Sequence, residues 1–305
     1  MLKKLILLLG ISVFAFAGYT LKLEKISDSV WKFYGEPSVP NKANAGNMVN
    51  TYWIKGNTSW IVIDSGPSYF YAKFSYEKMK KIANLPVKYV VNTHWHDDHR
   101  LGNNFFRTEF KEATLIGTQA QDKQYPASKK PKMIDLILPE DGKGTKNVKL
   151  DQYISKDQIL VLDGIELEFK YLGYNAHTPE DIIVYLPKEK VLFSGDLLFS
   201  ERITSTRDGS VEGGLKSLDD IEKFDVKVYA NGHGKHLDDT ALKLMRSYFT
   251  QLKTTALEAI DEGIDMNEYV AGTDFDNLKY LKMYDVLHKQ NLGFAYAEYE
   301  FFDGE

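Results

Sequence analysis

Three histidines and two aspartates occur within six consecutive residues, in the segment His94-Trp95-His96-Asp97-Asp98-His99. The segment follows Val87–Val91, a β-branched and aromatic run that is typical of a buried strand. On an extended chain alternate side chains share a face, so His94 and His96 would point the same way. Asp98 and His99 would lie past the strand end, where the chain can turn. Imidazole and carboxylate groups bind zinc and other divalent first-row metals, so the cluster predicts a metal site.

The alternative interpretation is a polar loop that happens to be rich in histidine. The chain of 305 residues has only seven histidines, so three of them within six positions favour a site over chance. The chain has no cysteine, which excludes thiolate ligands, disulfides and lipid attachment to a cysteine. Its stability must therefore come from the core and from the metal.

The spacing His-x-His-x-Asp-His resembles the signature of the metallo-β-lactamase fold superfamily. That superfamily takes its other ligands from three later motifs, and the chain has a match for each of them in the same order. The matching residues are His94, His96, Asp98 and His99 in the signature, His177 in Gly173–Thr178, Asp196 in Phe193–Asp196, and His233 in Gly232–Gly234. An early strand that ends in aspartate, Trp60–Asp64, also matches. Five motifs in order, spread over most of the chain, make the resemblance specific.

The resemblance implies a centre of two divalent metal ions, most simply Zn²⁺, although nitrogen and oxygen ligands also accept iron or manganese. The first ion would be bound by His94, His96 and His177, the second by Asp98, His99 and His233, and the Asp196 carboxylate would bridge them. Asp98 would also act in catalysis, by orienting the attacking hydroxide. Asp64 would hold a ligand or neighbouring backbone in place, or else cap the turn at Ser65-Gly66. Arg202 could meet an anionic substrate near the metals, although a surface salt bridge is the simpler interpretation.

Two ions about 3.5–4 Å apart hold a water as hydroxide near neutral pH and polarise the oxygen of an electrophile. The resemblance therefore implies a hydrolase in which metal-bound hydroxide attacks an ester, thioester, lactone or amide of a small molecule. Aspartate at position 196 matches hydrolases that keep a shared carboxylate, such as glyoxalase II-like thioesterases. Metallo-β-lactamases commonly have cysteine or a non-bridging residue there, so a β-lactamase is only the second alternative.

The chain from Asp196 onward is similar to secreted zinc metallohydrolases that are linked to quinoprotein and sulfur-oxidation systems. The similar segments are Asp196–Arg202, Asp208–Ser210, Leu287–Asn291 and Tyr296–Glu300, whereas the aromatic residue expected near Gly214 is missing. This similarity leaves a first alternative, a non-catalytic or redox-linked metal-binding accessory protein of such a pathway. The complete ligand set with its bridge favours the enzyme, because structural zinc sites usually hold one four-coordinate ion.

Four other polar or aromatic residues near these motifs have simpler interpretations. We expect Trp95 in the core and Asp97 in hydrogen bonds to the backbone. His236 follows the His233 motif and is expected at the rim of the site or in solvent. His288 lies among apolar residues at helical spacing and is expected to serve packing or to lie on the surface.

The first residues have the three parts of a secretory signal peptide. Lys3 and Lys4 form a basic start, residues 5–17 are mostly apolar, and Ala15-Phe16-Ala17 is a small-x-small cleavage pattern. Cleavage after Ala17 predicts a periplasmic or secreted protein with no membrane association, because the apolar run is shorter than the roughly 20 residues of a membrane span. An uncleaved anchor is the alternative.

The composition favours a folded protein without a nucleic-acid partner. Apolar residues make up 43% of the chain and aromatic residues 13%, which is enough for a sizeable core. The formal net charge is −5, whereas nucleic-acid binding usually requires a basic patch. We therefore expect a small-molecule substrate as the partner, and nothing in the sequence indicates the oligomeric state.

Ligands recur at the ends of strands that are separated by helices, which predicts an α/β fold. A hairpin closed by Gly56-Asn57 and a helix over 71–82 should precede the cluster. The resemblance implies the superfamily's four-layer αβ/βα sandwich over residues 18–238. A C-terminal helical extension, residues 239–305, would pack on the same domain, with helices at 239–263 and 277–287. We interpret residues 126–155 as a solvated loop, with a flap beside the site as the alternative.

Overall fold

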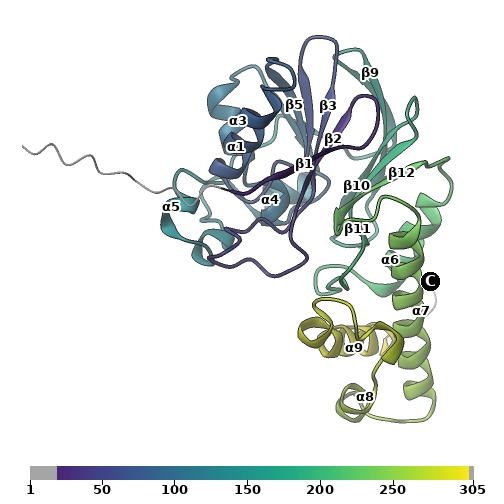
Figure 1. Ribbon diagram of the computed structural model, residues 1–305. Coiled ribbons are helices and arrows are strands. Elements are labelled where there is room, and N and C mark those ends of the chain that lie inside the picture. Colours follow the sequence, from purple (N-terminus) through teal and green to yellow (C-terminus); the bar gives the residue numbers. More distant parts are fainter. Residues whose placement is uncertain (1–18, 302–305) are drawn as a thin grey trace, which may run out of the picture.

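The computed structural model describes residues 19–301, so the expected signal segment, residues 1–17, lies outside the described residues. In this part of the chain two β-sheets pack face to face, and helices cover the outer face of each sheet (Figure 1). This is the predicted α/β sandwich of four layers. Within residues 19–301 no helix has both the length and the apolar character that crossing a membrane requires.

The first sheet contains seven strands between residues 22 and 153, and they lie side by side in sequence order. They are β1 (Lys22–Lys25), β2 (Val30–Tyr34), β3 (Thr51–Lys55), β4 (Trp60–Ile63), β5 (Val87–Val91), β6 (Thr114–Gly117) and β7 (Gln152–Tyr153). Neighbours are antiparallel from β1 to β4 and parallel from β4 to β7. The predicted hairpin joins β3 to β4, where Gly56 N donates to Ser59 O at 2.9 Å. Because β4 and β5 are parallel, Asp64 and the histidine cluster follow them at the same edge of the sheet.

The second sheet contains five strands between residues 158 and 233, in the order β12-β11-β10-β9-β8. They are β8 (Gln158–Leu162), β9 (Ile165–Leu172), β10 (Asp181–Leu186), β11 (Val191–Phe199) and β12 (Val228–His233). β11 and β12 are parallel, and the other neighbours are antiparallel. Asp196 lies within β11 and His233 ends β12, so this parallel pair delivers two of the predicted ligands to one edge.

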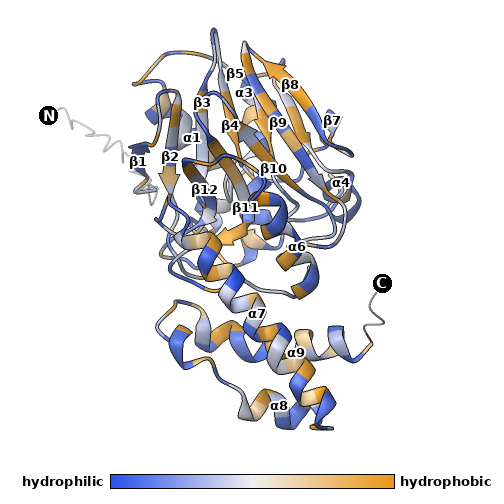
Figure 2. Cartoon of the chain, turned by 90° about the vertical axis from the view of Figure 1, so that its right-hand side faces the viewer, coloured by the Kyte–Doolittle hydropathy of each residue, from blue (hydrophilic) through white to orange (hydrophobic). Residues whose placement is uncertain are grey.

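Apolar side chains from the inner faces of both sheets fill the space between them. Ile54 and Ile63 from the first sheet pack in one core with Phe169 and Phe193 from the second. Tyr52 of β3 meets Phe193 of β11 across this interface, with ring centroids 5.3 Å apart. Figure 2 shows runs of hydrophobic residues within strands of both sheets. Removing this surface from water stabilises the fold by roughly 25 cal/mol per Å².

Helices α1 (Tyr69–Met79) and α3 (Asn103–Glu109) cover the outer face of the first sheet. Ser68 Oγ accepts a hydrogen bond from Tyr71 N and caps α1, so this helix starts and ends earlier than the predicted 71–82. Helices α6 (Val211–Ile221) and α7 (Thr240–Asp261) cover the second sheet. The shorter helices are α2 (Asp97–Arg100), α4 (Gln119–Gln124), η1 (Met133–Asp135) and α5 (Pro139–Gly142).

Residues 126–155 are largely irregular, as predicted, and contain only η1, α5 and the two-residue strand β7. The segment is nevertheless attached to the body of the protein. Asn147 Nδ2 donates to Lys129 O at 2.6 Å, and Asn147 Oδ1 accepts from Arg100 at 2.6 Å beside the histidine cluster. Met133 and Ile137 are buried. The segment is therefore a packed loop, and its role as a flap stays a prediction.

The C-terminal part is helical, with α7 followed by α8 (Met266–Gly272), η2 (Asp276–Leu278) and α9 (Tyr284–Glu300). The helix predicted at 239–263 is α7, but the one predicted at 277–287 is wrong. Leu278 and Leu281 are both buried and so mimic helical spacing, yet Met283 has φ of +65° and separates this turn from α9. Met245 and Leu252 of α7 share one apolar core with β11 and α9, which holds the extension against the second sheet.

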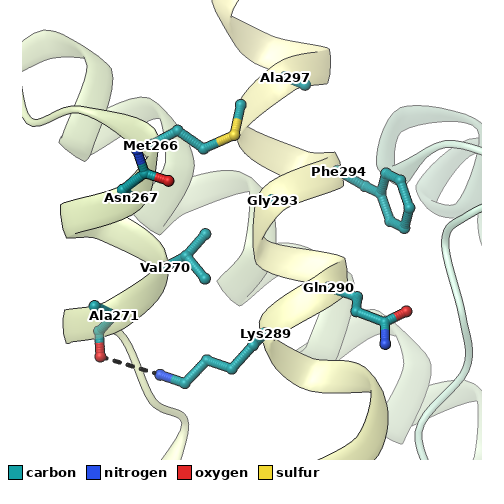
Figure 3. A pocket seen from close by; sticks show the side chains of 9 residues that line it. All are labelled: Met266, Asn267, Val270, Ala271, Lys289, Gln290, Gly293, Phe294 and Ala297. Carbon is teal, nitrogen blue, oxygen red and sulfur yellow. Dashed lines mark hydrogen bonds between the residues drawn. The ribbon is translucent and has the colours of Figure 1, made fainter.

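A groove of about 630 Å³ lies between α8 and α9 (Figure 3). Its walls are mostly apolar, Val270 points from α8 toward α9, and Lys289 closes one end by donating to Ala271 O at 3.3 Å. None of its lining residues is a predicted metal ligand. The groove is thus separate from the histidine cluster.

We expect Leu252→Ala in α7 to lower the free energy of unfolding by about 2–5 kcal/mol, because Leu252 is 0% exposed and its loss leaves a cavity. Leu257→Ala in the same helix is the matched control, since Leu257 is 37% exposed and should cost less than about 1 kcal/mol. Urea unfolding measures both changes. Equal losses would mean that α7 does not pack on the second sheet as described.

Candidate metal centre

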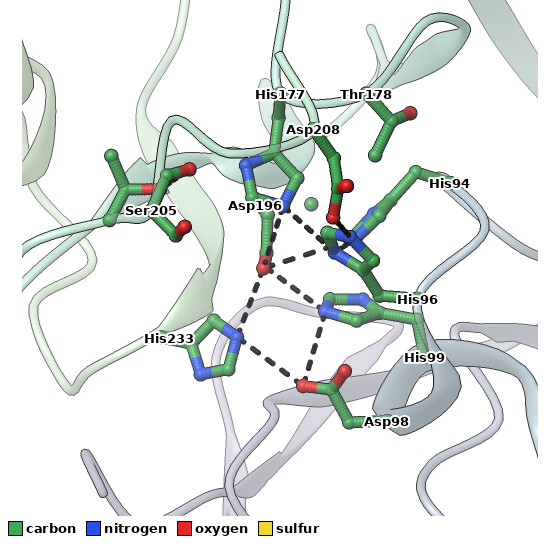
Figure 4. A network of polar contacts seen from close by, with 12 residues as sticks. His94, His96, Asp98, His99, His177, Thr178, Asp196, Ser205, Asp208 and His233 are labelled. Atoms are coloured by element: carbon green, nitrogen blue, oxygen red, sulfur yellow. Dashed lines mark hydrogen bonds and ion pairs between the residues drawn. The ribbon is translucent and has the colours of Figure 1, made fainter. Parts of the chain in front are cut away.

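The seven predicted ligands converge at one edge of the sandwich (Figure 4). His94 and His96 come from the bend after β5, Asp98 and His99 from α2, His177 from the loop between β9 and β10, Asp196 from β11, and His233 from the end of β12. They form two groups, and within each group one atom of every residue lies within 4.8 Å of the others. The structure therefore brings together residues that are up to 139 positions apart, from position 94 to position 233.

The first group contains three imidazoles whose nitrogens face one point. His96 Nδ1 lies 3.0 Å from His94 Nε2 and 3.0 Å from His177 Nε2. Strand β5 ends at Val91, so His94 and His96 share a direction because of the bend after the strand, and not because of the strand pleat that we expected. This geometry suits a single small cation with nitrogen ligands.

The second group contains Asp98, His99 and His233. Asp98 Oδ2 lies 3.7 Å from His99 Nε2 and 3.6 Å from His233 Nε2. All three side chains are buried, and they face the same point from α2 and from the end of β12. The group offers one oxygen and two nitrogen ligands.

Asp196 completes the first group and also contacts the second. Its Oδ2 atom lies 3.4 Å from His177 Nε2 and 3.2 Å from His233 Nε2. Its Oδ1 atom lies 3.0 Å from His99 Nε2. A carboxylate in this position can bind one cation with each oxygen, as a bridging ligand does.

Two buried polar atoms support the presence of cations here. Within the described residues, Asp98 Oδ2 has no hydrogen-bond partner, and His99 Nε2 has no well-aligned one although Asp196 Oδ1 is close. Leaving such groups unpaired in a folded protein costs about 1–3 kcal/mol each. Both atoms point into the cluster, so a bound metal ion would satisfy them.

Four of the imidazoles have a hydrogen-bond partner at their second nitrogen, and for His94 it is Thr93 Oγ1, 3.1 Å from Nδ1. His233 Nδ1 lies 2.7 Å from Met48 O, His99 Nδ1 lies 2.8 Å from Asp64 Oδ2, and His96 Nε2 lies 3.0 Å from Asp208 Oδ2. Because a carbonyl oxygen only accepts, His233 Nδ1 carries the hydrogen and its Nε2 lone pair faces the cluster. Such partners fix the orientation and tautomer of histidines that bind metals.

Asp64 takes the position that the resemblance implies for a supporting carboxylate. Its Oδ1 accepts from Thr93 N at 2.8 Å, and its Oδ2 accepts from Thr93 Oγ1 at 2.9 Å besides contacting His99. These bonds hold the start of the cluster segment and one histidine ring together. They run to Thr93 and His99, and not to the turn at Ser65-Gly66 that was the alternative.

Burial and charge set the protonation of the cluster. Burial lowers the pKa of His94 well below its ordinary value and that of His177 to about 3, so both rings are neutral, the form that binds metal. Burial alone would raise the pKa of Asp196, but His233 and His99 lower it well below the usual range. Burial opposes the charging of His99, yet Asp196, Asp64 and Asp98 together raise its pKa. Asp196 is therefore an anion among imidazoles.

Two carboxylates that support the cluster were not predicted as site residues. Asp181 Oδ2 accepts from His177 N at 3.0 Å and from Thr178 N at 2.9 Å, and burial raises the pKa of Asp181 to about 7 against these bonds. The sequence gives a local indication of this role, because Asp181 is an aspartate at the start of a strand, just after the loop that carries His177. Asp208 contacts His96 from 112 positions away in the sequence, and no local pattern indicates that contact.

The turn after His233 is held by residues of the first sheet. Lys32 Nζ donates to Gly234 O at 2.9 Å, and Asn50 Nδ2 donates to the same oxygen at 2.7 Å. Tyr52 Oη donates to Asn231 O at 2.7 Å, just before the histidine. Lys32 is only 1% exposed, and no carboxylate lies within 4.0 Å of its nitrogen among the described residues. The buried Lys32 thus helps to hold the turn that follows the ligand His233.

The expectation of a surface salt bridge for Arg202 is wrong. Arg202 is 6% exposed, and within residues 19–301 its guanidinium has no carboxylate within 4.0 Å. Its hydrogen bonds run to the carbonyls of Ile203 and Ser38, both at 3.3 Å. It lies over the ring of Phe199, 5.5 Å away, and Phe199 stacks in parallel on His233. Arg202 is therefore a buried cation close to the cluster, without a carboxylate within 4.0 Å among the described residues, and the charges of Asp196 and Asp98 act on it from farther away.

Of the other residues, Trp95 is only half-buried and not in the core, because it lies on the exposed side of the bend and meets Tyr125. Asp97 accepts from Met133 N at 3.0 Å, as expected for a backbone partner, and also pairs with Arg100. His236 is half-buried. His288 is buried against Tyr284 and Phe275, which confirms a packing role.

Comparison with known proteins gives matches over most of the chain. The family model described as "Metallo-beta-lactamase superfamily" matches residues 45–233. The beta-lactamase-like protein 2 homolog of Caenorhabditis elegans is 25% identical over 223 residues, which cover 73% of this chain and 67% of that protein. The metallo-beta-lactamase type 2 of Elizabethkingia meningoseptica is 26% identical over 247 residues, which cover 77% of this chain and 88% of that one.

A solved structure also has a similar fold. The stereoselective inverting sec-alkylsulfatase Pisa1 from Pseudomonas sp. superposes with a TM-score of 0.69 at 19% sequence identity. The match covers 93% of this chain but 51% of that one, so the chain spans about half the length of the sulfatase. Because the matched 93% of the chain is longer than the sandwich alone, the structural similarity extends into the C-terminal helices.

The stability contributed by Lys32 should rise with pH. Burial lowers its pKa from 10.5 to about 8 in the folded protein, against the opposing effect of Glu24 and Glu201. Between these two values the unfolded chain binds a proton that the folded chain has lost, so the free energy of unfolding increases with pH. Relative to Lys32→Met, the wild type should therefore gain about 2 kcal/mol between pH 7.5 and pH 10.

Urea unfolding of both proteins at the two pH values measures this difference. Lys55→Met, at an exposed position on β3, controls for the loss of a lysine and should show no such pH dependence relative to wild type. A difference between wild type and Lys32→Met that is the same at both pH values would contradict the burial of a charged Lys32.

Proposed function

The chain belongs to the metallo-β-lactamase superfamily, and from this premise we propose that it is a hydrolase that uses two divalent metal ions, most simply zinc. The observation that carries the proposal is the Asp196 carboxylate, whose two oxygens contact both ligand groups. His94, His96 and His177 would bind one ion, Asp98, His99 and His233 the other, and Asp196 both. Five imidazoles, two carboxylates and no thiolate suit zinc, and they also accept iron or manganese.

When bound, the pair of ions would supply an activated water near neutral pH and would polarise the oxygen of the scissile group. The protein's own residues do the rest. Asp98 is buried and faces the second group, where its carboxylate can accept a hydrogen bond from the attacking water and so orient it. His94 and His177 are neutral, so they bring no charge that would repel cations.

We propose that the substrate is a small-molecule ester, thioester, lactone or amide. The shared carboxylate at position 196 supports this class over dedicated cleavage of β-lactams, since the resemblance associates such lactamases with cysteine or a non-bridging residue there. The similarity to a metallo-beta-lactamase and to an alkylsulfatase gives two further substrates to test. A non-catalytic or redox-linked accessory role in a quinoprotein or sulfur-oxidation pathway is the alternative.

We also propose that the protein acts in the periplasm or is secreted, because residues 1–17 have the pattern of a signal peptide. Cell fractionation and N-terminal sequencing test this directly. A mature chain that begins at Gly18 supports the proposal, and a full-length chain in the cytoplasm contradicts it.

The protein purified with its natural metal should contain about two zinc ions per chain and hydrolyse at least one member of a chromogenic panel. The panel holds a thioester, a lactone, a cephalosporin, a phosphodiester and an alkyl sulfate. His96→Ala and Asp196→Ala should each lower the metal content and reduce turnover by about 10³-fold or more, with little change in the circular dichroism spectrum. His236→Ala is the matched control, because this half-buried histidine lies outside both ligand groups.

Full turnover in either ligand variant would refute the site assignment. Bound iron, or two zinc ions with no turnover of any substrate, would favour the accessory role. Metal-free protein that binds no added zinc, iron or manganese would mean that the cluster is not a metal site.

Arg202 supports a narrower proposal, that the substrate carries an anionic group. A buried guanidinium without a carboxylate partner is unfavourable, and an anion bound beside Phe199 would offset that cost. A charge-assisted hydrogen bond contributes about 1.5–3 kcal/mol, so Arg202→Met should raise KM roughly 10- to 100-fold for a substrate with a carboxylate. Its neutral methyl ester should be little affected.

Steady-state kinetics with this pair of substrates measures the effect, and Arg246→Met serves as the control because Arg246 pairs with Asp219 and Glu222. An equal loss for the charged and the neutral substrate would show that Arg202 only supports the structure.

A further inference from the structure

The segment between β11 and α6 forms a wall of the metal centre, since Thr204–Thr206 and Ser210 line the same pocket as His177 and Asp196, and helix α9 holds one end of this segment. Asn291 of α9 is fully buried. Its Oδ1 atom accepts from Thr206 N at 3.0 Å, and its Nδ2 atom donates to Thr204 O at 2.8 Å. Tyr248 of α7 fixes the amide, since its hydroxyl accepts a second hydrogen bond from Nδ2 at 2.8 Å. Backbone groups at two positions of the wall therefore depend on one side chain of the C-terminal helices.

Helix α9 also holds the other end of this segment. Glu298 accepts hydrogen bonds from Val211 N at 2.7 Å and from Glu212 N at 2.9 Å. These are the first amide groups of α6, which have no partner within their own helix. Ser210 Oγ accepts from the next amide, Gly213 N, at 2.9 Å. The start of α6 is thus fixed to α9 through a carboxylate.

Asp208 lies between these two anchors and points into the metal centre (Figure 4). Its Oδ2 atom lies 3.0 Å from His96 Nε2, and Arg207 Nη2 donates to the same oxygen at 2.6 Å. Just beyond it the backbone is pressed against the His177 loop, where a Cβ on Gly209 would lie 2.0 Å from Ala176 O. The segment therefore has little freedom to bring Asp208 to His96 in another way.

His96 is the ligand that most needs such a partner. It faces the first group with Nδ1, whereas His94 and His177 use Nε2, and its side chain is 19% exposed while theirs are buried. A rotation of this ring would remove Nδ1 from the group, and the other tautomer would place a hydrogen on it. The contact with Asp208 opposes both changes, because it is satisfied when Nε2 carries the hydrogen and points outward.

We propose that the C-terminal helices are a working part of the metal centre: Asn291 and Glu298 of α9 are positioning residues that hold Thr204–Ser210, so that Asp208 fixes the ring and tautomer of His96. The inference rests on the proposed metal site. It assigns the extension a role in metal affinity in addition to packing. Carboxylate partners of metal-bound histidines typically change affinity by 10- to 100-fold, and this sets the size of the effect.

The experiment titrates metal-free full-length protein with Co²⁺ and with Zn²⁺ in competition with a chromogenic chelator. It compares wild type with Asp208→Ala, Asn291→Ala and Glu298→Ala. Gln290→Ala and Glu300→Ala are the matched controls, because both residues are exposed on the same helix. The visible spectrum of bound Co²⁺ reports the loss of a histidine ligand, and circular dichroism reports the fold.

We expect Asp208→Ala to weaken binding of one of the two ions by about 10- to 100-fold and to alter the Co²⁺ spectrum, with the second ion unaffected. Asn291→Ala and Glu298→Ala should change the same ion in the same direction. If they act through Asp208, the double variant Asp208→Ala/Asn291→Ala should bind no more weakly than Asp208→Ala alone. The two controls should match wild type.

Unchanged affinity in Asp208→Ala would overturn the inference, and Asp208 is partly exposed, so this variant should fold even if Asn291→Ala does not. Additive losses in the double variant would also overturn it, because they would mean that Asn291 acts through general stability. His96→Ala separates the two proposals. If His96→Ala leaves metal binding intact, the metal site itself is wrong, whereas an effect of His96→Ala without one of Asp208→Ala rejects only the role of α9.

Discussion

The centre depends on one buried carboxylate, Asp196, that meets imidazoles on both sides. Its Oδ1 faces His99 and its Oδ2 faces His177 and His233, and it can stay ionised in the interior because positive charge or bound cations surround it. Two glycines make room for it. Gly195 has φ of +51° and would clash with Thr93 if it had a Cβ, and a Cβ on Gly232 would lie 2.1 Å from Asp196 Oδ1. The register between β11 and β12 shifts on both sides of Gly195, next to Asp196.

Much of the centre could be predicted from the sequence because its signals are local. The cluster from His94 to His99 lies within a single turn of chain, and the motifs around His177, Asp196 and His233 each follow or end a strand with an apolar pattern. The resemblance to the superfamily then gave the layers of the sandwich, and the family match confirms it. The narrower similarity to quinoprotein-linked and sulfur-oxidation enzymes, the signal peptide and the domain boundary at residue 238 stay predictions.

The parts that could not be predicted are contacts between distant segments. Nothing near Asp208 indicates that it meets His96, and nothing near Lys32 indicates that it supports Gly234, since each contact exists only after the sheets have packed. The burial of Arg202 could not be predicted for the same reason, because it comes from Phe199 and from the loop that carries Ser38. The helix expected at 277–287 does not form, because Met283 has a left-handed backbone conformation. The spacing of apolar residues does not reveal such a conformation.

The spread of the centre along the chain also has a consequence for its biosynthesis. Its ligands begin at His94 and end at His233, and the side chains that hold the wall beside His96 lie at positions 291 and 298. A growing chain therefore has the histidine cluster long before it has the residues that complete the pocket around it. Loops that close over so many residues form late in folding. The full ligand set and the side chains that hold the wall beside it are thus together only after the last helix has been made and docked.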